Sequence, residues 1–146
     1  GNMATEIAEL DFSLDDFHNQ KVLRGADAYA RLIQRLLFMR KGTYPTIPDM
    51  GIDISSYRFA DLDVLSAGDL KNTIQQQCDT YIEHVPIQDI IISTVRIASG
   101  YVLFIDISVA GDLKKISIAM LQDGGEIINT RLKVEKPKLI NVPRGM

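Results

Sequence analysis

The sequence has no tryptophan, a single cysteine and only two histidines among its 146 residues. One cysteine cannot close an intramolecular disulfide, and with two histidines it cannot complete the usual four-ligand zinc site. No apolar run approaches the roughly 18 residues of a membrane span, and the N-terminus GNMATEIAELDF lacks the basic and apolar regions of a secretory signal. We therefore expect a cytosolic protein without structural zinc or a membrane segment.

The remaining composition is that of an ordinary soluble globular protein, with 46% apolar and 24% charged residues and a net charge of −3. A chain of this length fits one compact domain. We expect an N-terminal extension over residues 1–8, a single α+β domain over 9–130 and a basic C-terminal tail over 131–146. The tail holds five basic residues and one acidic residue, a net +4, so the preceding 130 residues carry −7.

The basic tail has two interpretations. It is either a solvated surface segment or a segment that docks on an acidic partner or on a neighbouring copy of the chain. Nucleic-acid binding is disfavoured, because no aromatic residue interleaves with these charges. We expect the tail to become ordered on its partner, since it combines like charges with several apolar residues.

Two stretches have helical periodicity. The first is expected over residues 27–40, with Gly42 as its C-terminal stop, and its apolar stripe consists of Tyr29, Leu32, Ile33, Leu36, Leu37 and Met39. The second is expected to begin at a Ser66 cap and to end at Pro86. Its apolar stripe consists of Leu70, Ile74, Cys78, Tyr81, Ile82 and Val85. Because Cys78 lies within that stripe, we interpret it as a buried apolar residue rather than a catalytic thiol.

After the second helix the period changes to two, which predicts strands. The apolar positions expected to face the core are Ile91, Val95 and Ile97, then Tyr101, Leu103, Ile105, Ile107 and Val109, then Ile116, Ile118 and Met120. Ser99-Gly100 suits a tight hairpin, and a turn at Asp123-Gly124-Gly125 leads to a fourth strand around residues 127–134. With a short strand and a turn over residues 9–24, the predicted fold is α+β: an antiparallel meander of three to four strands packed against two main helices.

No motif for phosphate, dinucleotide, calcium or zinc-protease chemistry is present, and there is no nucleophile elbow. Carboxylates cluster in sequence at Asp15 and Asp16, Asp49 and Asp53, Asp61 and Asp63, and Glu83 and Asp89. No pair stands out as catalytic, because acidic residues in loops usually cap helices or face water. We therefore predict no enzymatic activity, no cofactor, no metal ligand and no small-molecule substrate.

The stretch LLFMRKGTYPTIPDMGIDISSY, residues 36–57, is the most distinctive part of the chain. Pro45 and Pro48 fix their own φ and restrict the residues before them, while Gly42 and Gly51 can supply positive φ at either end. These residues predict a loop of fixed shape without regular secondary structure. Such loops usually present a surface to a partner.

A helix followed by RKGTYPTIPDMGID also resembles the baseplate wedge family of contractile-tailed bacteriophages, called baseplate assembly protein W and, by an old label, lysozyme-like. In that family a helix ends in Arg-x-Gly-(Glu or Thr), followed by Pro-x-(aromatic or Met)-Gly. The corresponding positions in this sequence are Arg40, Gly42, Thr43, Pro48, Met50 and Gly51. The order of elements also agrees, over roughly residues 9–120.

The resemblance implies a structural protein of the inner baseplate of a phage tail or a related injection machine, assembled in the bacterial host cytoplasm. Its expected partners are larger wedge proteins and the tail sheath protein, which would build on a strand edge, and it would use no nucleic acid or membrane. The expected partner-binding residues are the six above together with Glu83 and Pro86. One departure is that the family's Glu-Pro-Arg motif after the second helix reads EHVPI in this sequence, so its arginine is missing.

Two alternatives remain open at this point. One is a regulatory adaptor that shares the fold and binds a cellular protein. The other is a muramidase-type hydrolase, which would need a carboxylic acid of raised pKa and a second carboxylate in a cleft. The chain has no tryptophan to stack on sugar rings, which disfavours a sugar-binding groove.

Overall fold

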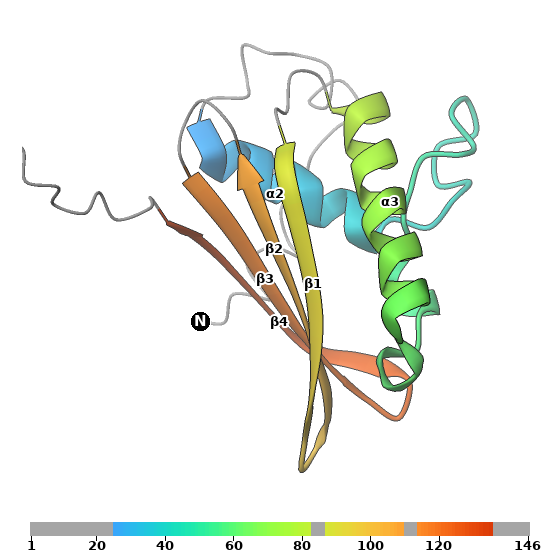
Figure 1. The fold of residues 1–146 in the computed structure, drawn as a ribbon. Helices are drawn as coiled ribbons and strands as arrows, with labels where there is room; N and C mark the ends of the chain where they lie inside the picture. Colours follow the sequence, from blue (N-terminus) through green and yellow to red (C-terminus); the bar gives the residue numbers. More distant parts are fainter. Residues whose placement is uncertain (1–24, 83–86, 110–113, 136–146) are drawn as a thin grey trace, which may run out of the picture.

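The computed structural model describes residues 25–82, 87–109 and 114–135. Its main elements are α2 (Gly25–Phe38), α3 (Val64–Tyr81), β1 (Ile87–Ile97), β2 (Gly100–Val109), β3 (Lys114–Asp123) and β4 (Glu126–Glu135) (Figure 1). The strands form one antiparallel sheet in the order β1-β2-β3-β4. Helix α3 lies alongside β1, and α2 lies across β3 and β4. The predicted α+β fold, a meander packed against two helices, is confirmed.

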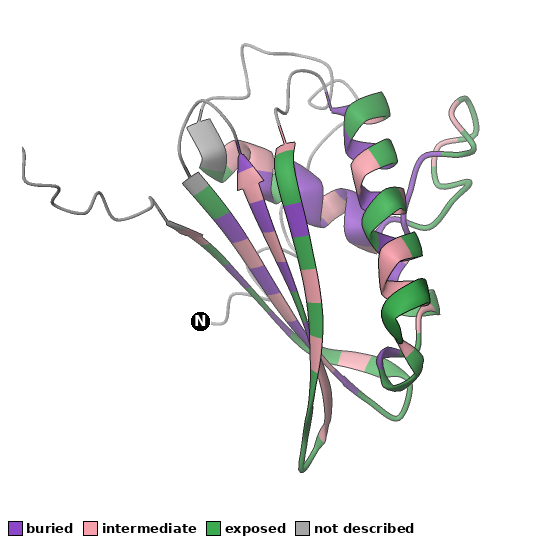
Figure 2. Cartoon of the chain, in the orientation of Figure 1, coloured by how far each residue is buried: buried purple, intermediate pink, exposed green. Residues whose placement is uncertain are grey.

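The core lies between the helices and one face of the sheet (Figure 2). The apolar stripe predicted for the first helix is buried, apart from a half-buried Tyr29. Strands β2 and β3 alternate strictly, so that one side chain in two enters the core. The buried strand residues are Ile90, Leu103, Ile105, Ile107, Val109, Ile116, Ile118, Met120 and Leu132.

The face predicted for β1 is wrong. Ile91, Val95 and Ile97 are exposed, whereas Ile90 is buried and Ile92 is partly buried. The pairing register explains the difference, because Ile90 lies opposite the buried Ile107 on β2 and shares its face. Three consecutive isoleucines at 90–92 carry no alternation from which the inward face could have been read.

Both predicted hairpins exist, with one shift in position. The β1–β2 loop consists of Ala98 and Ser99, and Gly100 is already the first residue of β2, paired with Ile97. The loop was expected one residue later. The β3–β4 turn is as predicted: Gly124 and Gly125 both have positive φ, of 64° and 92°, as a two-residue hairpin of type I′ requires.

The second helix begins earlier than predicted. Its N-cap is Asp63, whose carboxylate accepts the backbone N–H of Ser66 at 2.8 Å, while the Ser66 hydroxyl accepts the N–H of Asp63 at 2.9 Å. Ser66 is therefore the third residue of a capping box rather than the cap. The Ser66 backbone N–H holds the pKa of the Asp63 carboxyl below its usual value. The helix ends at Tyr81, before the predicted end at Pro86.

The predicted boundary between the domain and the basic tail is corrected by β4. This strand continues to Glu135 and pairs with β3 along its length, and Leu132 on it is buried. The first five residues of the predicted tail therefore belong to the sheet. The predicted strand over residues 9–24 and the rest of the tail, residues 136–146, lie outside the described residues.

The predicted burial of Cys78 is confirmed, since its side chain is inaccessible to solvent. Burial raises the pKa of its thiol to about 12. The thiol is therefore neutral in the folded protein at neutral pH, which removes the thiolate that nucleophilic chemistry requires.

We predict a specific loss of stability at high pH from this thiol. In the unfolded chain it ionises near its ordinary pKa of about 8.5, so above that pH the unfolded state binds fewer protons than the folded state. The contribution of Cys78 to the free energy of unfolding should then fall by up to about 1.4 kcal/mol per pH unit, and should be constant below about pH 8. Urea denaturation of the protein and of Cys78→Ala at several pH values measures this difference. A difference that does not change between pH 8 and 10.5 would contradict the prediction.

Candidate functional site

The segment between the two helices contains the predicted loop. We call residues 39–53 the proline loop; it contains no helix or strand and projects beyond α3 (teal in Figure 1). Two short 3-10 turns, η2 (Ile54–Ser56) and η3 (Phe59–Asp61), follow it and lead to α3.

Two consecutive turns shape the outer part of the proline loop. The N–H of Ile47 donates to the carbonyl of Tyr44 at 2.9 Å, and the N–H of Met50 donates to the carbonyl of Ile47 at 3.2 Å. Pro45 and Pro48 each occupy the second position of a turn, where their fixed φ fits best. The prolines therefore set the turns, as the sequence suggested.

Hydrogen bonds across the loop close its base. The N–H of Gly42 donates to the carbonyl of Pro48 at 2.9 Å. The Lys41 ammonium donates to the carbonyls of Asp49 and Gly51, each at 3.0 Å. One lysine thus joins the two arms of the loop through backbone groups.

A buried glutamine fixes the proline loop to α3. The Gln77 side chain is 2% exposed; its Oε1 accepts the N–H of Gly51 at 2.8 Å, and its Nε2 donates to the carbonyl of Asp49 at 3.0 Å. The amide therefore satisfies a donor and an acceptor of an irregular backbone. Without it, these groups would lose their partners in a largely dry environment.

A second buried glutamine acts in the same way further along the chain. Oε1 of Gln122, on β3, accepts the N–H of Phe59 at 2.8 Å, and its Nε2 donates to the carbonyl of Tyr57 at 2.8 Å. Sequence reasoning missed both glutamines. A signal existed, because Gln77 adjoins Cys78 in the buried stripe and Gln122 continues the alternation of β3: each is a polar residue at an inward position.

Gly51 is the most constrained residue of the loop. Its φ is 130°, and a Cβ atom at this position would lie 2.6 Å from the carbonyl oxygen of Met39. Both Gly51 and Met50 are buried. Their assignment as partner-contacting residues is therefore corrected: Met50 packs in the core, and Gly51 permits the close approach of two backbone segments.

The other predicted contact residues of the loop are at the surface. Arg40, Gly42, Thr43 and Pro48 are exposed on one continuous stretch of chain. Between the base of the loop and α3 lies an open, largely polar cleft, lined among others by Arg40, Lys41, Asp53, Tyr57, Thr73 and Gln76. Two cations and several amide and hydroxyl groups suit contact with the carboxylates and carbonyls of a partner. Glu83 and Pro86 lie outside the described residues.

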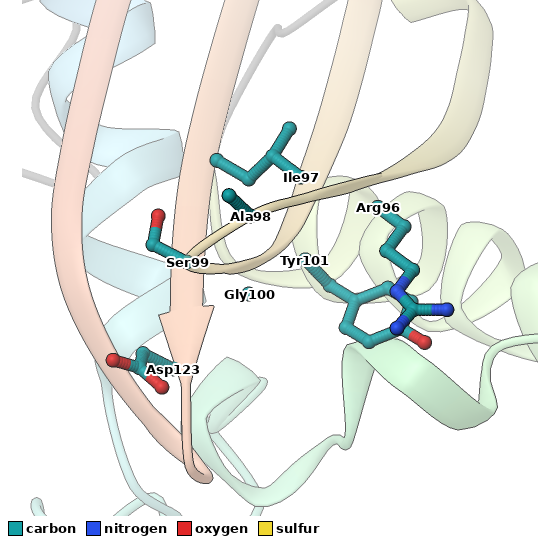
Figure 3. A pocket seen from close by; sticks show the side chains of 7 residues that line it. All are labelled: Arg96, Ile97, Ala98, Ser99, Gly100, Tyr101 and Asp123. Carbon is teal, nitrogen blue, oxygen red and sulfur yellow. The ribbon is translucent and has the colours of Figure 1, made fainter.

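A second hollow lies at the tip of the β1–β2 hairpin (Figure 3). Arg96 and Tyr101 are cross-strand partners and extend to the same side, while the Asp123 carboxylate points away from them. Within the described parts of the chain, no three metal-ligating side chains gather and no helix is long and apolar enough to cross a membrane.

Comparison of the chain with protein-family models and with curated proteins finds no match to either. The geometry of the proline loop and of the sheet is therefore the basis for the functional proposals below.

We predict that Gly51→Val lowers the free energy of unfolding by roughly 3 kcal/mol, because valine is disfavoured at this φ and its Cβ would contact backbone. Gly68→Val is the matched control, since a Cβ at Gly68 in α3 has no neighbour within 4 Å. The control should melt at or slightly above the temperature of the unchanged protein. If the two variants had the same melting temperature, the loop would not need glycine at position 51.

Proposed function

We propose that the protein is a structural component of a contractile phage tail or a related injection machine. In this role it lies in the inner baseplate, contacts larger wedge proteins and starts assembly of the tail sheath. The observation that carries the proposal is the edge of β1, whose outer side pairs with no described strand and whose central residues 90–95 carry no charge.

Strand β1 lies at the edge of the sheet, and no described strand pairs with its outer side. Its central residues, 90–95, read IIISTV and contain no charge. Edge strands of soluble proteins are usually protected by charged residues, prolines or bulges, because their free backbone groups pair readily with other chains. In β1 a register shift and Asp89 lie at one end and Arg96 lies near the other, so the uncharged middle of the strand is the part suited to accept a strand from a partner.

The opposite edge is built differently. Strand β4 carries charges along its length, with Glu126, Arg131, Lys133 and Glu135. Such charges disfavour pairing with another chain. The contrast between the two edges favours β1 as the site of strand addition.

The surface beside β1 continues the apolar character of this edge. A shallow groove between the first turn of α3 and the middle of β1 is lined by Leu62, Val64, Ala67, Ile92, Ser93 and Thr94, with Asp63. Val64 is 92% exposed and the adjacent Leu65 is 75% exposed. Two large apolar side chains at the solvent-facing start of a helix suit burial against a partner. A strand added to β1 would lie close to them.

The proline loop supports the wedge contact. Its shape is fixed by Pro45, Pro48 and Gln77, so a partner that binds it loses little conformational entropy. The exposed residues Arg40 and Thr43 belong to the motif that resembles the wedge family. The loop and the β1 edge would then engage different neighbours in one assembly.

We predict that the double substitution Val64→Glu and Leu65→Glu abolishes sheath initiation without changing stability. Both side chains are exposed, and glutamate is favourable in the first turn of a helix. The measurement is co-expression with candidate sheath and wedge proteins from the same genome, with assembled rings counted by electron microscopy. Ile128→Glu is the control, because Ile128 is 53% exposed but lies on β4.

Three results would count against the proposal. Rings that form equally well with the double variant would exclude the groove as the assembly contact. A gene without tail neighbours, together with binding of a cellular protein, would favour the regulatory adaptor. Release of reducing sugar from peptidoglycan by the purified protein would instead favour the hydrolase.

A further inference from the structure

The face of the sheet that points away from the helices carries an apolar patch. Cross-strand pairing aligns Val95 with Val102 and Val102 with Leu121, which forms an apolar row across three strands. Phe104 lies in the next row and is 37% exposed. We call this surface the outer sheet face; its apolar members are Ile91, Val95, Ile97, Val102, Phe104 and Leu121.

Basic residues border this patch on the side of β4. Arg131 is paired across the sheet with Ala119, which is paired with Phe104, so Arg131 lies in the same row as the aromatic ring. Lys115 and Lys133 lie further along the same face, and Lys115 is 3.9 Å from the Asp106 carboxylate. The outer sheet face is therefore mostly apolar on β1 and β2, apart from Asp106, and its basic residues lie on β3 and β4 beside Leu121.

We propose that residues 9–17 of this chain, ELDFSLDDF, dock on the outer sheet face. In this segment Leu10, Phe12 and Leu14 recur at every second position, and four acidic residues with no basic residue surround them. An extended chain with this pattern places its apolar side chains on one side. The apolar side chains would cover the apolar row, while the carboxylates would face Arg131 and its basic neighbours.

The length of chain before α2 permits this contact. Helix α2 begins at Gly25 (blue in Figure 1) and contacts β3 and β4. Eight residue steps separate Phe17 from Gly25, and an extended chain spans about 3.3 Å per residue, or roughly 26 Å. Passing from the helix layer around the end of the sheet to its other face requires about twice the ~10 Å between packed layers, or roughly 20 Å. The connection is therefore long enough.

A second copy of the chain fits this face less well. If two outer sheet faces met, each would bring the same basic residues towards the other, whereas residues 9–17 bring only negative charge. The docking also goes beyond the proposed baseplate function and does not depend on it.

The lack of native tryptophan gives a direct test. Phe104→Trp places the only indole of the full chain on the outer sheet face, and its fluorescence reports whether water reaches it. We expect short-wavelength emission that is independent of protein concentration, and a shift to longer wavelength when Phe12→Asp is added. Arg131→Glu should produce a smaller shift in the same direction. The comparison is Val64→Trp, which lies on α3 and should not respond to Phe12→Asp.

The outcomes separate the alternatives. Water-exposed emission in the chain without Phe12→Asp would overturn the proposal, as would short-wavelength emission that does not respond to Phe12→Asp. Short-wavelength emission that appears only at high concentration, with dimers in analytical ultracentrifugation, would assign the face to a second copy and also overturn it. Circular dichroism confirms folding of each variant. Val95→Trp provides a second reporter on the same face if Phe104→Trp does not fold.

Discussion

The pair of hydrogen bonds made by the Gln77 side chain is the constraint on which the shape of the proline loop depends. A long irregular segment leaves backbone groups without the partners that a helix or a sheet would supply. The Gln77 amide presents one acceptor and one donor to Gly51 and Asp49. It can do so because its neighbours on α3, Ile74 and Cys78, are fixed in the core. The loop thereby acquires a defined surface without becoming regular secondary structure.

The way the helices pack on the sheet determines which surfaces the protein presents to partners. The helices cover one face of the sheet, and the outer sheet face is the one proposed to bind residues 9–17. Among the described residues this leaves the proline loop and the β1 edge with Val64 and Leu65 for partners. These two surfaces lie on different segments of the chain, so occupation of one does not require displacement of the other. A small protein with two separate contact surfaces suits the structural role proposed for it, in which contacts rather than chemistry are the function.

Patterns with a clear period were predictable from the sequence, and ambiguous ones were not. Strict alternation in β2 and β3 identified their buried faces correctly. The prediction failed in β1, where Ile91 was expected to face the core. Three consecutive isoleucines show no alternation, so which of them faces the core depends on the pairing of β1 with β2. Ser66 was predicted as the helix cap, but the capping box is reciprocal: Asp63 is the cap and Ser66 is its partner three residues later. Gln77 was missed because its partners are backbone groups 26 and 28 residues away, which no local pattern encodes.

Amide hydrogen exchange at Gly51 tests the role of Gln77 most directly. The Gly51 N–H is buried and donates to Gln77, so it should exchange only when the loop separates from α3, at a rate close to that of the buried amides of this helix. Thr46, at the exposed tip of the same loop, provides the internal comparison. In Gln77→Leu the Gly51 amide should exchange much faster, while the core of the sheet is unaffected. If Gly51 exchanges as fast as Thr46 in the unchanged protein, Gln77 does not hold the loop.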